Sequence, residues 1–282
     1  MGDKTGRGLA QVRERGLLVL EPPTPVLAST DVHDLSVWTR PTVTSLYSWM
    51  AARPQPTQPQ TTATEQPEIL ARGPWPLEQV KASWREEHYE PSREHTEAAD
   101  AAIDELRERG SPSHDGVAAR LIDYTQDQSE GIAMELQPQR WALRLNAGDA
   151  SQSVAALCVT RSADGRWLAG RRASWVASWA GRWALGAGGA VDLDENPADT
   201  LVRELHEEWS VTPERVRGEA LVRLPHRLVM FVGQAWLAEG IDAEVKPDHE
   251  HDEFAWWPRE IDEWPAEAEA PLRLMARWLS AE

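Results

Sequence analysis

Cysteine and long hydrophobic runs are what this sequence of 282 residues most clearly lacks. Cys158 is the only cysteine, so the chain cannot form an internal disulfide, and we expect a reduced thiol in a cytoplasmic protein. No apolar run approaches the roughly 20 residues of a membrane-spanning helix. The run Gly16–Leu20 is also too short for the core of a secretory signal. We therefore expect no membrane partner.

Positive charge is also scarce. The chain has 29 Lys and Arg residues against 46 Asp and Glu residues, which gives a formal net charge of −17. A surface of this sign repels the phosphates of nucleic acid, so we expect no nucleic-acid partner. A small phosphorylated substrate is compatible with this charge, because a bound divalent metal reverses the sign locally. The 15 tryptophans predict core and pocket-lining rings, and their number alone indicates no ligand.

The first part of the chain does not show the pattern of a folded domain. Residues 1–73 are expected to be a mobile tail, and Ala52–Glu68, rich in Pro, Thr and Gln, a flexible linker that cannot bury a core. Residues 74–146 predict a small α+β extension. Its expected elements are two helices, Pro76–Tyr89 and Thr96–Arg109, and three strands, Val117–Tyr124, Gly131–Leu136 and Trp141–Leu145.

A Ser-His-Asp sequence, Ser113 to Asp115, lies in this extension between two glycines. The residues of a catalytic triad are usually far apart in sequence and meet only in the fold. We therefore interpret these three residues as a hydrogen-bonded turn.

The most informative stretch is Gly189–Val211, GAVDLDENPADTLVRELHEEWSV. Asn196 can cap a helix and Pro197 suits its first position, so the helix is expected to begin there. Glu204, Glu207 and Glu208 are spaced i, i+3 and i+4 and therefore share one face of it. Carboxylates grouped in this way repel one another unless a cation binds, and their hard oxygen atoms suit Mg²⁺ or Mn²⁺.

This stretch resembles the Nudix box, G-x5-E-x7-R-E-U-x-E-E-x-G-U, where U is a bulky aliphatic residue. Every fixed position matches except the last glycine, which is Ser210 here. The difference leaves the acids in place but alters the turn after the helix, where glycine would tolerate left-handed geometry. Before the box, Ala187 stands where many Nudix hydrolases have proline, and this variant also resembles the branch related to isopentenyl-diphosphate isomerase.

The resemblance implies an α/β/α Nudix sandwich with a mixed sheet at residues 147–282. It implies that Glu204, Glu207, Glu208 and the carbonyl of Gly188 bind Mg²⁺, with Mn²⁺ as the alternative. Glu195 would support the loop and helix, and Arg203 would orient Glu204. The expected elements of this domain are the strands Ser153–Thr160, Trp167–Arg172, Gly218–Leu224, Leu228–Phe231 and Gln234–Leu237, and the helix Pro265–Leu279.

Further site residues are expected on both sides of the box. Arg171 and Arg172 end a predicted strand, and one of them can contact a phosphate or a base, although a solvated charge is an equal alternative. The backbone at Gly189 can approach a diphosphate closely. By resemblance, the acidic loop downstream supplies the general base, for which Glu250 and Glu253 are the candidates alongside Glu204. His249 and His251 are expected to be solvated or to support a ligand from behind.

These residues predict a metal-dependent hydrolase that splits the diphosphate linkage of a nucleoside diphosphate derivative, a small-molecule substrate. One alternative is a Nudix module that senses a nucleotide without turnover, which the intact acids disfavour. The other is an isomerase of prenyl diphosphates, whose chemistry normally uses a cysteine near the reacting carbon. Cys158 lies in an apolar run and is expected to be buried. The extension before the domain can form part of the substrate pocket or of a homodimer contact.

Overall fold

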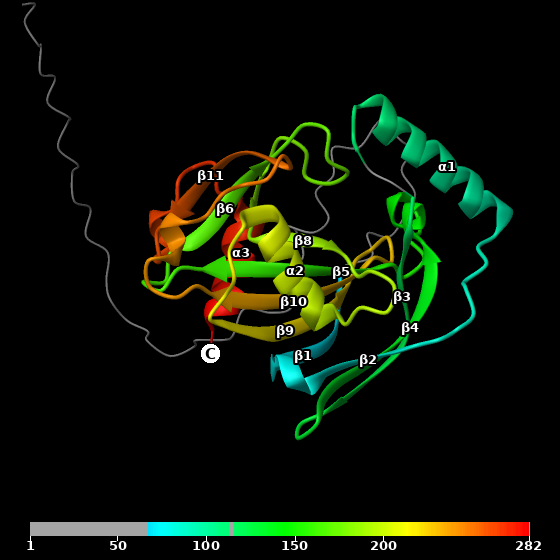
Figure 1. Cartoon of the computed structure of the whole chain (residues 1–282), viewed down its shortest axis with the longest axis horizontal. Coiled ribbons are helices and arrows are strands. Elements are labelled where there is room, and N and C mark those ends of the chain that lie inside the picture. The colour runs from blue at the N-terminus through cyan, green and yellow to red at the C-terminus, as the bar shows by residue number, and fades with distance from the viewer. Residues whose placement is uncertain (1–66, 113–114, 282) are drawn as a thin grey trace, which may run out of the picture. The chain divides into compact units, whose positions relative to one another are not determined.

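A computed structural model describes residues 67–112 and 115–281 of the chain. Its main sheet has the strand order β1-β9-β10-β5-β6-β11 (Figure 1). In addition, β7 pairs with β6 and β8 pairs with β5. Only β10 and β5 pair in parallel in this sheet, so the sheet is mixed, as expected. The strands are β1 (Glu68–Pro76), β5 (Val154–Arg161), β6 (Trp167–Arg172), β7 (Trp183–Leu185), β8 (Ala187–Ala190), β9 (Arg215–Arg223), β10 (Val229–Trp236) and β11 (His251–Trp257).

A helix covers each face of this sheet, which confirms the α/β/α sandwich (Figure 1). Along β5, Val154, Ala156 and Cys158 join the core cluster that contains Leu201 and Leu205 of α2 (Pro197–Trp209). The intervening positions face a second core cluster. The helix α3 (Ala270–Ser280) contributes Leu272, Met275 and Leu279 to this cluster. Neighbouring residues of a strand point to opposite faces, so one apolar strand serves both layers.

The N-terminal module, residues 67–146, adds β1 to the edge of the main sheet and builds a second sheet of three strands. That sheet has the order β2-β4-β3, with β2 (Val80–Trp84) parallel to β4 (Gly131–Arg140) and β3 (Val117–Asp127) antiparallel to it. The helix α1 (Arg93–Glu108) packs on a short 3-10 helix, η3 (Trp141–Leu145), through a separate apolar cluster. Other single 3-10 turns are η2 (Leu77–Gln79), η4 (Ile241–Ala243) and η5 (Ile261–Glu263).

Two predicted elements of the module are wrong. The helix expected at Pro76–Tyr89 is instead the end of β1, then η2 and β2, because main-chain pairing with β4 stabilises an extended segment there. The strand expected at Trp141–Leu145 is η3, in which the adjacent side chains of Ala142 and Leu143 are both buried, a pattern that a two-sided strand does not give. The helix expected at Thr96–Arg109 is confirmed, although it begins three residues earlier, with Ser92 as its cap.

Boundaries also differ from expectation. The predicted limit between residues 73 and 74 falls inside β1, which pairs with β9 from Glu68 onward. The strands expected at Leu228–Phe231 and Gln234–Leu237 form the single strand β10. Gly233 lies between them, and a Cβ there would lie 2.3 Å from Leu201 Cδ1, so glycine lets α2 pack closely. The expected tail, most of the linker, and Ser113 and His114 lie outside the described residues.

Among the residues that the structure describes, none of the helices has both the length and the apolar character needed to cross a membrane.

Candidate active site

The acidic helix α2 begins and ends where its sequence predicts. Asn196 Oδ1 accepts a hydrogen bond from Ala198 N at 3.0 Å, and Pro197 occupies the first turn. At the other end Ser210 adopts the left-handed conformation, with φ 58°, and its N–H donates to the carbonyl oxygen of His206. Serine therefore takes the geometry for which the Nudix box normally has glycine, and the helix ends without displacement of its acids.

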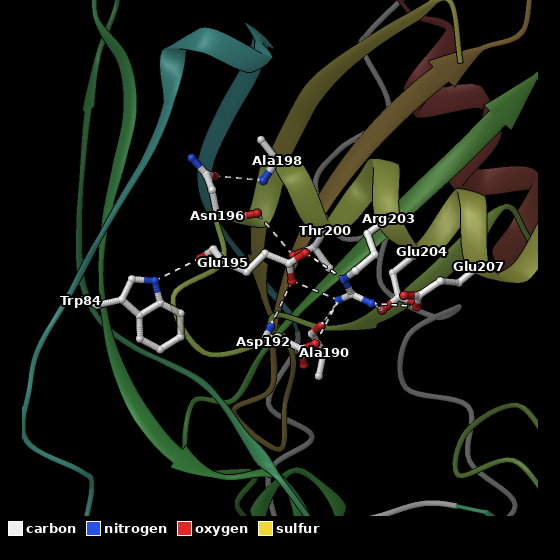
Figure 2. A network of polar contacts seen from close by, with 10 residues as sticks. All are labelled: Trp84, Ala190, Asp192, Glu195, Asn196, Ala198, Thr200, Arg203, Glu204 and Glu207. Carbon is white, nitrogen blue, oxygen red and sulfur yellow. Dashed lines mark hydrogen bonds and ion pairs between the residues drawn. The ribbon is translucent and has the colours of Figure 1, made fainter. Parts of the chain in front are cut away.

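Arg203 connects the acids of this helix to the loop before it (Figure 2). Its guanidinium donates to both carboxylate oxygens of Glu195, at 2.8 and 3.0 Å. It also donates to Glu204 Oε1 at 2.8 Å and to Glu207 Oε2 at 2.9 Å. Glu195 in turn accepts from Thr200 Oγ1 at 2.8 Å, so the carboxylate that holds Arg203 is itself fixed.

The same loop is attached to the N-terminal module. Trp84 Nε1 donates to the carbonyl oxygen of Glu195 at 3.0 Å (Figure 2). Asn196 Nδ2 donates to the carbonyl oxygen of Val80 at 2.8 Å. The second sheet is also bridged to the domain at Ala118 and Asp192. The module thus contacts the loop that orients Arg203, which the sequence did not indicate.

Glu204 is buried against the glycine strand β8. A Cβ on Gly189 would lie 2.0 Å from Glu204 Oε1, so only glycine leaves room for this carboxylate. Burial raises the pKa of Glu204 to about 7; Arg203 opposes the shift and Glu207 adds to it. Glu207 is exposed on the same side of the helix. A carboxyl group with this pKa can exchange a proton near neutral pH.

Glu208 is only 4% exposed and lies next to Gly188. Its Oε1 accepts a hydrogen bond from Gly188 N at 3.0 Å, but its Oε2 has no hydrogen-bond partner in the described part of the chain. The side-chain nitrogen atoms that face it, His251 Nε2 and Arg172 Nη1, are 3.6 and 3.7 Å from Oε2. Burial raises the pKa of Glu208 well above its usual range, against the opposing charge of Arg172. A buried oxygen in this state requires a proton or a cation.

The structure separates the other predicted residues into two groups. Arg172 and Glu250 form an ion pair at 2.9 Å beside Glu208, so both lie at the box. Arg171 pairs with Glu253 at 3.3 Å, and both side chains are exposed. Because Arg171 and Arg172 are adjacent in β6, their side chains point to opposite faces of the sheet. Arg171 and Glu253 therefore lie away from the acids of α2, and of the two arginines and the two acids predicted as alternatives, Arg172 and Glu250 are the ones beside Glu208.

The two histidines of the acidic loop also differ. The side chain of His251 is 1% exposed and packs on Trp209, with ring centroids 4.3 Å apart, so it is not solvated. A Cβ on Gly170 would overlap both rings, which shows why glycine occupies that position of β6. His249 is exposed and stacks on Trp175 at 5.2 Å. Of the two, His251 is the one that supports Glu208 from behind.

A pocket opens beside these groups. Its lining combines a polar group, Arg172, Glu208, Gly188 and Gly189, with apolar side chains of β5, β10 and α3, namely Leu157, Met230, Leu272 and Met275. Arg144, from η3 of the N-terminal module, also lines it. Arg144 lies in a segment that the sequence predicted as a strand, and no motif marks it. The pocket can accommodate a ligand with one anionic and one apolar part.

The acids suit a hard divalent cation, although residues 67–112 and 115–281 contain no group of three or more His, Cys, Asp or Glu side chains already arranged to hold a metal ion. Arg203 draws Glu204 and Glu207 together in this arrangement, and Arg172 faces Glu208. Two observations support the fit. Glu208 Oε2 is buried without a hydrogen-bond partner, and the space next to Glu204 exists only because residue 189 is glycine. The donor atoms are carboxylate oxygens, which Mg²⁺ and Mn²⁺ prefer.

The mixed sheet between two helices, with buried acids of one helix facing a glycine strand, is the arrangement that the Nudix resemblance predicts. Residues 151–279 match the family model described as the NUDIX domain, which confirms the resemblance of Gly189–Val211. The chain thus carries a Nudix domain, preceded by the N-terminal module. No curated protein sequence matches it.

Several solved structures resemble the chain. A MutT protein from Methanosarcina mazei Go1 is 23% identical, with 45% of this chain and 95% of that chain covered and a TM-score of 0.34. A MutT NUDIX hydrolase from Burkholderia pseudomallei is 24% identical, with 45% and 98% covered and a TM-score of 0.38. An Ap4A hydrolase from C. elegans is 19% identical, with 45% and 96% covered and a TM-score of 0.33.

Proposed function

We propose that this protein uses a divalent metal ion to hydrolyse the diphosphate linkage of a nucleoside diphosphate derivative, giving a nucleoside monophosphate and a second phosphorylated fragment. The observation that carries this proposal is Glu208 Oε2, a buried carboxylate oxygen without a hydrogen-bond partner in the lining of a pocket. Mg²⁺ is the proposed ion, with Mn²⁺ as the alternative. The single, buried cysteine is consistent with a cytoplasmic enzyme.

Glu204, Glu207 and Glu208 would hold the ion, with the carbonyl of Gly188 as a further ligand. When bound, the ion would neutralise charge on the diphosphate, which otherwise repels an attacking oxygen nucleophile. Glu195 and Arg203 fix the orientation of Glu204, because Arg203 donates a hydrogen bond of 2.8 Å to each of the two carboxylates. Preorganised charges of this kind need no rearrangement during the reaction.

The reaction needs a group that accepts a proton from the attacking water. Glu204, which Arg203 holds at 2.8 Å, and Glu250, paired with Arg172 beside Glu208, are the two candidates. Attack forms a bond from the water oxygen to phosphorus and breaks the bond to the bridging oxygen. The bridging oxygen leaves with the second fragment, and the proton passes to the carboxylate. Glu253 is excluded from this role because it pairs with Arg171 away from the acids.

The isomerase alternative requires a cysteine that reaches the substrate. Cys158 is completely buried in the core between β5 and α2, and burial raises the pKa of its thiol to about 12. It does not line the pocket beside Glu208. Nothing in its position favours catalysis at carbon.

The test is a Mg²⁺-dependent hydrolysis screen over nucleotide sugars, ADP-ribose, NADH, dinucleoside polyphosphates, nucleoside triphosphates and prenyl diphosphates. Glu208→Gln is the test variant, and Glu214→Gln, an exposed acid outside the site, is its matched control. We expect one nucleotide class to be hydrolysed by the wild type and by Glu214→Gln, with kcat/KM at least about 10³-fold lower in Glu208→Gln. Nucleotide binding without turnover would support a sensor instead.

A further inference from the structure

Arg144 belongs to the N-terminal module but lines the pocket of the Nudix domain. It lies in η3, outside the matched residues 151–279. The pocket that it lines also contains Glu208, Arg172 and Gly189, the groups expected to meet a diphosphate. The pocket of this domain is therefore incomplete without the module.

The backbone that carries Arg144 is firmly held. Ala142 and Leu143 are fully buried against Ala99, Ile103 and Leu106 of α1. The N-terminal end of η3 is fixed by Asp115, which accepts hydrogen bonds from Ala142 N at 3.0 Å and from Arg140 Nε. The guanidinium of Arg144 lies 5.5 Å from the ring centroid of Trp141. A side chain on such a base can hold an anion with little additional loss of conformational freedom.

Two arginines line the pocket, Arg144 and Arg172. Arg172 pairs with Glu250 at 2.9 Å and faces Glu208 at 3.7 Å. An arginine presents a fork of N–H donors that matches the oxygen atoms of a phosphoryl group.

We propose that Arg144 binds a phosphoryl group of the substrate, so that the N-terminal module supplies a substrate-binding residue to the Nudix site. This inference rests on the proposed function, since it assigns part of the diphosphate to a named side chain. It also gives the module a direct role in specificity, because Arg144 would contact the substrate itself. The apolar lining of the pocket comes from other elements.

The test compares Arg144→Gln and Arg144→Lys with Arg107→Gln, an exposed arginine of α1 that pairs only with Asp104 at 3.0 Å among the contacts described. Two binding constants are measured by calorimetry: Mg²⁺ alone, and imidodiphosphate, a diphosphate analogue that resists hydrolysis, in the presence of Mg²⁺. KM and kcat are measured on the substrate found in the screen.

We expect Arg144→Gln to raise the Kd of imidodiphosphate about 10- to 100-fold, because a charge-assisted hydrogen bond is lost, and to raise KM more than it lowers kcat. Arg144→Lys should recover part of the affinity, and Arg107→Gln should match the wild type. Affinity for Mg²⁺ alone should not fall, because removal of a positive charge near Glu204 cannot weaken the binding of a cation.

Wild-type affinity for imidodiphosphate in Arg144→Gln would overturn this inference and leave the proposed function intact. A parallel loss of Mg²⁺ binding would also overturn it, since that result indicates a structural role. Failure of the wild type to hydrolyse any nucleotide and to bind imidodiphosphate would overturn the proposed function together with this inference.

Discussion

The Nudix domain and the N-terminal module contribute to the same site in different ways. In the domain, the residues that carry the chemistry are neighbours on one helix, spaced so that Glu204 and Glu208 share a face. In the module, Trp84 and Arg144 lie far apart in sequence and reach the site only through the fold. The comparison teaches that a local spacing can reveal a metal-binding helix, whereas the residues that orient it or line its pocket leave no local pattern.

Among the variants that keep all the acids of α2, the largest effect is expected within the domain, at Gly189→Ala. The added Cβ would lie 2.0 Å from Glu204 Oε1 and must displace that carboxylate, whereas Gly148→Ala meets no atom within 4 Å. A displacement of about 1 Å at reacting groups can reduce the rate about 10²-fold. We therefore expect kcat/KM to fall by about that factor in Gly189→Ala and not in Gly148→Ala. Equal activity of the two variants would show that Glu204 does not need its present position.

A smaller effect is expected at the contact between the two regions, in Trp84→Phe. This change keeps an aromatic ring but removes the N–H that donates to the carbonyl oxygen of Glu195 at 3.0 Å. Loss of a group that orients ligands from behind typically reduces metal affinity about 10- to 100-fold. We expect Mg²⁺ affinity to fall toward the lower end of that range. Trp278→Phe, on α3, is the control. If both variants bind Mg²⁺ like the wild type, the module does not support the metal site through Trp84.

Glu195, whose carboxylate accepts two hydrogen bonds from Arg203, should make the free energy of unfolding depend on pH. Burial raises the pKa of Glu195, but hydrogen bonds from Arg203, Thr200 and Asp192 N outweigh this effect, so its pKa is lowered on folding. Its contribution is therefore present above the unfolded pKa of about 4.3 and is lost as pH falls through the lower folded value. Urea unfolding should show Glu195→Gln less stable by about 1–2 kcal/mol at about pH 7, with a smaller difference at about pH 3. A difference that does not change with pH would contradict this account.

The smallest effect is expected at Cys158, whose thiol has its pKa raised to about 12 by burial. A thiol reagent should not modify the folded protein at neutral pH, because the Cys158 side chain is buried and its raised pKa keeps it in the unreactive thiol form. Rapid modification should appear only in urea. Reaction of the native thiol, with loss of activity, would restore the alternative in which this cysteine reaches the substrate.

The fold of the domain was largely predictable from its sequence, whereas in the module α1, β3 and β4 were predicted and two other elements were predicted wrongly. The cap at Asn196, the first-turn Pro197 and the apolar stripe of α2 are local signals, and the structure follows them. The segment Val80–Trp84 was wrongly predicted as helix. It is extended because its pairing with β4, some fifty residues away in the chain, outweighs local preference.

The site divides in the same way. The spacing of Glu204, Glu207 and Glu208 predicted which acids share a face, but not that Arg203 would join two of them to Glu195. The sequence also could not separate Arg171 from Arg172, or Glu250 from Glu253. That choice depends on the register of β6 with β11, which pairs Arg171 with Glu253 and Arg172 with His251.

The most direct test of the central claim, that the acids of α2 bind a divalent metal, is a calorimetric titration of Mg²⁺ into the wild type and Glu208→Gln without substrate. We predict saturable binding to the wild type and to the control Glu214→Gln, with affinity at least about tenfold weaker in a folded Glu208→Gln. Equal Mg²⁺ affinity in all three proteins would contradict the claim.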